Sequence, residues 1–218
     1  MTLSTQLLLT ATLMGGLLGA EPMETQTEAA LTVWLYDYAD VAPGTLERSR
    51  RQATRILNQA GLRIRWELCP ISAEEAEQNR DCARRAAVDT IRLGILSKKM
   101  AKKTTKRGIE FGYAVALAEG FGVIAGVYLD RTVREADSIG LERHIMLGHT
   151  IAHEIGHLLL GQGSHSQRGI MSPTWRGREI NLAKTGRFLF SQDQAERMQV
   201  QVAARIRAAR ADSVTAAN

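Results

Sequence analysis

Long hydrophobic runs are scarce in this 218-residue sequence. The most extended apolar stretch lies in residues 1–20, which carry no charged side chain. Glycines interrupt it, and it is too short for a comfortable membrane span of about 20 apolar residues. A small residue at its end, Ala20, suits a secretory signal, although no basic residue precedes the apolar run. We therefore expect residues 1–20 to be a signal peptide and residues 21–30 a flexible leader. The alternatives are an N-terminal anchor or a misassigned start.

Cysteine is nearly absent, since Cys69 and Cys82 are the only two. They bracket a polar, charge-rich segment that has little capacity to form a core. In an exported protein they most simply form a disulfide across that segment, while two free thiols or a metal-binding pair are the alternatives. The signal and the disulfide together predict a secreted or periplasmic protein without stable membrane association after signal removal. The leader contains no cysteine, so latency through a leader thiol is unsupported.

Aromatic residues make up only 5% of the chain, and none is interleaved with the basic cluster at residues 97–107. The net charge of +5 could attract an acidic partner. Single-stranded nucleic acid, however, is bound by aromatic side chains that stack on bases, and no nucleic-acid motif is present. We expect no specific nucleic-acid binding and find no internal repeat.

The remaining chain predicts one mixed α/β domain over residues 31–212, followed by a disordered tail at 213–218. Alternating or β-branched segments predict about five strands, and apolar stripes with capping signals predict three principal helices. A helical crossover predicts parallel pairing of the first two strands. In the last helix, Met198, Val202 and Ile206 are expected to form an apolar stripe, while Arg197, Arg205, Arg207 and Arg210 supply much of the positive charge. The expected strands are residues 31–38, 62–68, 88–96, 111–117 and 122–129, and the helices are 45–60 (capped by Thr45), 145–160 and a final helix to about 210, begun by a Ser191–Gln194 capping box.

Potential metal ligands and a potential general base occur together in His153-Glu154-Ile155-Gly156-His157, which is followed by His165. On one helix, histidines four residues apart lie on one face, so two imidazoles can converge on one cation. Glu154, on the neighbouring flank, can act as a general base without being a ligand. Three imidazoles from His153, His157 and His165 leave a fourth position open, which is typical of one catalytic Zn²⁺. His149 is a rival ligand, but eight residues of helix span about 12 Å, so one ion does not take all three helical histidines.

This motif resembles that of the metzincin zinc metallopeptidases, in its matrixin-like form. Gly169-Ile170-Met171-Ser172-Pro173 is similar to the family's methionine turn, with Met171 as a packing floor rather than a ligand. The spacing differs, because His165 follows His157 by eight residues where the family has six, and Leu160 fills the position of the family glycine. The specific residues lie between His153 and Met171, whereas element order extends the resemblance from about residue 31 to 210.

The resemblance implies a fold with an antiparallel edge strand that binds extended peptide. Residues 111–118 occupy that place, so Tyr113, Ala114 and Val115 are expected to contact substrate, with Trp175 in the pocket near the methionine turn. The expected function is a secreted zinc endopeptidase that hydrolyses polypeptides with zinc-activated water and Glu154 as general base. Two alternatives remain: a metallopeptidase that uses Glu196 as third ligand, and a non-catalytic zinc-binding or interaction protein. Cobalt or nickel would also suit three imidazoles.

Overall fold

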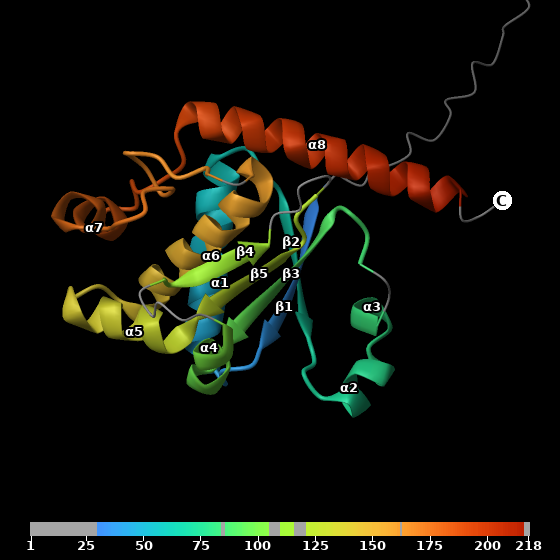
Figure 1. The fold of residues 1–218 in the computed structure, drawn as a ribbon, viewed down its shortest axis with the longest axis horizontal. Helices are drawn as coiled ribbons and strands as arrows, with labels where there is room; N and C mark the ends of the chain where they lie inside the picture. The colour runs from blue at the N-terminus through green and yellow to red at the C-terminus, as the bar shows by residue number, and fades with distance from the viewer. Residues whose placement is uncertain (1–29, 84–85, 105–109, 116–120, 162, 216–218) are drawn as a thin grey trace, which may run out of the picture.

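A five-stranded mixed sheet forms the centre of the computed structural model (Figure 1). The structure describes residues 30–83, 86–104, 110–115, 121–161 and 163–215. The strand order is β2-β1-β3-β5-β4. Neighbouring strands are parallel except β4, which runs antiparallel to β5 at one edge. The structure thus confirms the predicted mixed α/β class, the parallel pairing of the first two strands and the antiparallel edge strand. The strands are β1 (Leu31–Asp37), β2 (Ile64–Cys69), β3 (Thr90–Leu96), β4 (Gly112–Val115) and β5 (Ile124–Tyr128).

Eight helices surround the sheet within the described ranges, more than the sequence predicted. α1 begins at Pro43 rather than after a Thr45 cap, because the fixed φ of proline suits the first helical turn and Ala42 occupies the cap position. The last helix extends to Thr215, so residues 213–215 are helical instead of part of a tail. The helices are α1 (Pro43–Gln59), α2 (Ala73–Gln78), α3 (Arg80–Ala83), α4 (Lys98–Thr104), α5 (Leu129–Ser138), α6 (Arg143–Leu160), α7 (Gly177–Lys184) and α8 (Gln192–Thr215).

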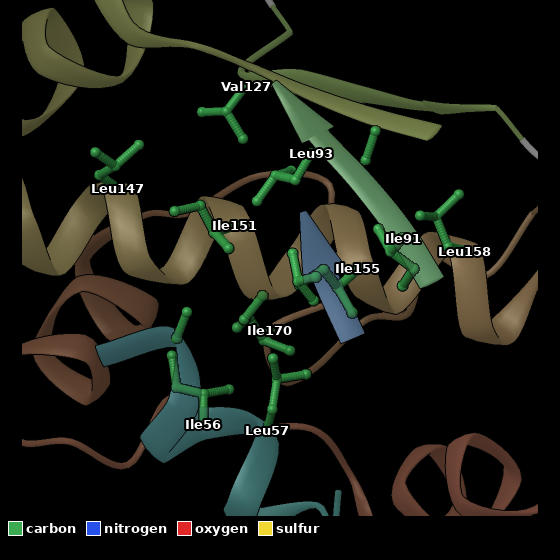
Figure 2. Close-up of a cluster of buried hydrophobic side chains, with 14 of the residues drawn as sticks. Ile56, Leu57, Ile91, Leu93, Val127, Leu147, Ile151, Ile155, Leu158 and Ile170 are labelled. Atoms are coloured by element: carbon green, nitrogen blue, oxygen red, sulfur yellow. The ribbon is translucent and has the colours of Figure 1, made fainter. Parts of the chain in front are cut away.

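Helix α6 is the most deeply buried helix and carries the histidine motif. Thirteen of its 18 residues are buried. One face packs on the sheet through Ile151 and Ile155, against Leu93 and Val127, and the other side meets α1 (Figure 2). At Gly148 the two helices approach so closely that a Cβ there would lie 2.8 Å from the Ser49 carbonyl oxygen. The core therefore fixes the position and rotation of the helix that bears the candidate ligands.

Arg205 of α8 is fully buried, unlike what its place among the charge-bearing arginines of this amphipathic helix suggests. Its guanidinium donates hydrogen bonds to the carbonyl oxygens of Val88 (3.1 Å), Gly122 (2.8 Å) and Leu158 (2.9 Å). It therefore joins α8 to the segments before β3 and β5 and to the last turn of α6. Burial lowers the pKa of Arg205 to about 10, so the side chain is still charged at neutral pH.

The start of α8 is the predicted capping box. The Ser191 hydroxyl accepts from the Gln194 amide (3.3 Å), and the Gln194 side-chain oxygen accepts from the Ser191 amide (3.0 Å). These reciprocal bonds satisfy two backbone donors at the end where α8 meets the segment after α7.

Cys69 and Cys82 form a disulfide with Cα atoms 5.7 Å apart, which confirms the predicted pairing. The bond closes the segment that contains α2 and ties it to the edge strand β2. Within the described ranges, no helix combines the length and apolar character needed to cross a bilayer. The expected signal peptide at residues 1–20 lies outside the described residues and stays a prediction.

Candidate metal centre and active site

Helix α6 presents His153 and His157 one turn apart on the same face. Their Nε2 atoms are 3.0 Å apart. Both side chains are partly buried and line a cavity between α6 and the edge of the sheet. The regular spacing of an α-helix accounts for this pair, as the sequence predicted.

His165 reaches the same point from the loop after α6. Gly161 ends the helix with φ of 87° and Gly163 follows with φ of 69°, a backbone region that favours glycine. The loop returns His165 so that its Nε2 lies 3.1 Å from Nε2 of His157. The spacing between the second and third histidines, two residues longer than in the family pattern, therefore still brings three imidazoles together.

Two residues that sequence reasoning missed orient the imidazoles. Nδ1 of His153 lies 2.7 Å from the carbonyl oxygen of Ile170, and because a carbonyl only accepts, Nδ1 carries the proton. Nδ1 of His157 lies 2.9 Å from the hydroxyl of Ser164. The Nε2 lone pair of His153 is thus directed at the other two rings. Ser164 adjoins His165 in sequence, which is a weak signal, whereas a backbone carbonyl leaves no sequence signal at all.

The donor set fits zinc. Four-coordinate zinc with Zn–N bonds of about 2.05 Å separates its nitrogen ligands by roughly 3.3 Å, close to the spacing seen here. Burial, with a smaller contribution from neighbouring imidazoles, lowers the pKa of His153 to about 4 and that of His157 to about 3. Both rings are therefore neutral at pH 7, as metal ligation requires. Neutral imidazoles that converge through their nitrogen lone pairs repel one another, and a bound cation would offset this repulsion.

Glu154 lies in the same cavity with its side chain 4% exposed. It makes no hydrogen bond or ion pair within the part of the chain that the structure describes. Burial alone raises the pKa of its carboxyl to about 8. A buried carboxyl without a partner among the described residues is costly for the fold, and groups with such perturbed pKa values are concentrated at functional sites.

The cavity has a volume of about 340 Å³ and opens between β4 and the Ser172–Trp175 segment. Tyr113, Ala114 and Trp175, which are expected to contact substrate, line this cavity, whereas Val115 is not among the lining residues and is 43% exposed. The Trp175 indole donates to the Ser172 carbonyl (3.1 Å), which fixes it as a wall. The lining residues are Glu110, Phe111, Gly112, Tyr113, Ala114, Thr150, His153, Glu154, His157, Gly161, His165, Ser172, Pro173 and Trp175.

Met171 is fully buried and packs against α6, where the resemblance places it as a packing floor beneath the histidines. A Cβ on Gly156 would lie 2.6 Å from the Met171 sulfur, so the thioether rests on the helix backbone between the two ligating positions. Met171 also accepts a hydrogen bond from the Ser166 amide (3.0 Å) through its carbonyl. The turn therefore supports His153 through Ile170 and the His165 loop through Met171.

The rival ligands lie elsewhere. His149 is fully buried, with Nδ1 2.8 Å from the Ile145 carbonyl oxygen and its ring stacked on Phe188 at 5.6 Å. Glu196 is exposed on α8 and accepts a hydrogen bond from Gln192 (2.9 Å). Neither belongs to the cluster of three imidazoles, so the geometry does not support Glu196 as third ligand.

The fold and the site together define a mixed α/β protein with a cleft in which three histidines converge and could hold a metal ion. No family model matches the chain, and no curated protein matches it in sequence. Among solved structures, it is similar to archaemetzincin from Methanopyrus kandleri, with 13% identity, a TM-score of 0.47, and coverage of 82% of this chain and 98% of that one.

Proposed function

We propose that this protein is a zinc-dependent peptidase that hydrolyses polypeptides. The observation that carries the proposal is the buried carboxyl of Glu154, which has no hydrogen-bond or ion-pair partner among the described residues and lies in the same cavity as three converging Nε2 atoms. A purely structural zinc site is closed by four protein ligands and needs no base beside it. Here the described residues supply three ligands and one carboxyl that is not among them.

His153, His157 and His165 would hold the ion through Nε2. When bound, zinc would act as a Lewis acid that activates water and polarises the scissile carbonyl. Glu154 accepts the proton of the attacking water and returns it to the leaving amine. Burial raises the pKa of the Glu154 carboxyl in the metal-free protein, and the positive charge of a bound zinc ion would lower it again, so that the carboxylate can accept a proton.

The position of β4 at the edge of the sheet favours a polypeptide as the substrate. Within the described chain β4 pairs only with β5, so its other edge is available to extended backbone. An added strand would gain main-chain hydrogen bonds along the cavity that contains Glu154. Phe111 and Trp175, with ring centroids 6.2 Å apart, form an apolar wall for one substrate side chain. The disulfide is consistent with export, which is part of the proposal.

Cleavage of a diverse peptide library, read by mass spectrometry, tests this function. The native protein with zinc should cleave, while Glu154→Gln should lose at least about 100-fold in rate and retain its zinc. Glu196→Gln, an exposed carboxyl changed in the same way, serves as the matched control and should cleave like the native protein. Equal cleavage by Glu154→Gln would contradict the mechanism. Bound zinc with no cleavage by any variant would favour the non-catalytic zinc-binding protein.

A further inference from the structure

The Glu154 carboxyl lies against the edge strand at a position that has no side chain. A Cβ placed on Gly112 would be 2.5 Å from Glu154 Oε1 and 2.7 Å from its Cδ. Carbon and oxygen atoms at such separations overlap, so even alanine cannot share this space with the carboxyl in its present position. Because Gly112, the first residue of β4, has no side chain, it leaves a space that the Glu154 carboxyl fills.

The alternation of β4 explains why Gly112 is the residue concerned. Successive residues of a strand point to opposite faces of the sheet. Ala114 packs on the main core beside α6, and Gly112 shares its face. Tyr113 lies on the other face, where its ring covers Gly126 and is 6.0 Å from Tyr128. The two β4 positions that face α6 are thus occupied by the two smallest amino acids, glycine and alanine.

Backbone conformation does not require glycine at this position. Gly112 is not among the glycines with positive φ, so an L-residue could adopt its conformation. Glycine weakens a strand because it loses more conformational freedom on folding. Available space is the remaining reason for glycine, and the nearest atoms are the Glu154 carboxyl and the carbonyl oxygen of Gly126, the latter also 2.5 Å from a built Cβ.

We propose that Gly112 is a positioning residue for the general base: its missing side chain holds open the slot in which the Glu154 carboxyl lies between α6 and β4. This inference rests on the proposed function, since it concerns how that base is placed. A side chain at residue 112 displaces the carboxyl from the slot while leaving the three imidazoles, which lie on α6 and the following loop, in position.

A double-mutant cycle in the metal-free protein tests the packing. Urea unfolding midpoints are compared for the native protein, Gly112→Ala, Glu154→Ala and the double variant. We expect Gly112→Ala to lower the midpoint in the native background and to lower it by a smaller amount in Glu154→Ala, where the carboxyl is gone and the contact with the Gly126 carbonyl oxygen remains. Equal shifts in the two backgrounds would overturn the proposal, because the cost would then come from Gly126. The same holds if Gly112→Ala and the double variant both fail to fold.

Kinetics test the positioning role. We expect Gly112→Ala to lower kcat at least tenfold while KM changes less than about threefold and one zinc per chain is retained. Gly94→Ala, a matched glycine in β3 whose Cβ would meet only side-chain atoms of Leu96 and Tyr38, should keep native kcat and KM. Native kcat in Gly112→Ala, or a loss confined to KM, would overturn the proposal. Failure of the proposed function is distinct, since it appears as a native protein without Glu154-dependent cleavage.

Discussion

Replacement of Glu154 by glutamine should remove a strong pH dependence from the stability of the metal-free protein. Burial raises the pKa of Glu154 to about 8 in the folded state, against an ordinary value of 4.5 in the unfolded chain. Between these values the folded protein holds a proton that the unfolded chain releases. The stabilising contribution is therefore complete below pH 4.5 and is lost as pH rises through 8.

The magnitude follows from the two pKa values. A pKa difference of one corresponds to about 1.36 kcal/mol, so the free energy of unfolding should fall by about 2.5 kcal/mol between pH 5 and pH 7 from this carboxyl alone. Burial lowers the pKa of His149, His153 and His157, so these rings act in the opposite sense and reduce stability as pH falls below 6.5. Glu154→Gln retains all three, so the difference between native protein and variant isolates the carboxyl.

Urea unfolding followed by circular dichroism, with zinc removed by a chelator, provides the assay. From pH 5 to pH 7 the variant should gain about 2.5 kcal/mol relative to the native protein. Glu196→Gln should follow the native curve throughout. If Glu154→Gln and native protein show the same pH dependence, the carboxyl is solvated in solution and the reasoning from its burial is refuted.

Three further predictions concern the supports of the site. Arg205→Met should lower the free energy of unfolding by at least about 3 kcal/mol, because two buried carbonyls and one partly buried carbonyl lose their donor. The matched control Arg207→Met, an exposed arginine on the same helix, should change it by less than about 0.5 kcal/mol, and urea unfolding at pH 7 compares the two. Replacing Cys69 and Cys82 together by serine should cost about 3 kcal/mol through the larger freedom of the unfolded loop, and an unchanged midpoint under oxidising conditions would contradict it. Ser164→Ala should weaken zinc binding about 10- to 100-fold, measured by competition with a chelator, and native affinity would show that the hydroxyl does not orient His157.

The parts of the site that depend on helical period were predictable from sequence. His153 and His157 lie four residues apart on a helix with an apolar body, and that spacing fixes their convergence. The arrival of His165 could be expected from the glycines that follow Leu160, since two residues with positive φ allow the chain to reverse. The parallel first strands followed from the helical crossover between them.

The supports of the site could not be predicted because they use backbone atoms and empty space. The carbonyl of Ile170 orients His153, and any residue at that position would offer the same carbonyl. Arg205 resembles the other arginines of α8 in sequence, and only the packed fold brings three carbonyls to it. Gly112 resembles an ordinary turn glycine until Glu154 is seen beside it. Helices α5 and α7 were missed because their tertiary contacts, rather than a long apolar stripe, stabilise them.

We propose that three imidazoles of this chain bind one zinc ion in the cleft that contains Glu154. The most direct test of this proposal is a crystal structure of the zinc-loaded protein with anomalous diffraction recorded on both sides of the zinc absorption edge. We expect one anomalous peak per chain at about 2.0–2.1 Å from Nε2 of His153, His157 and His165, with Glu154 outside the ligand set. The absence of a peak there, or a peak bound by other residues such as Glu196, would contradict it.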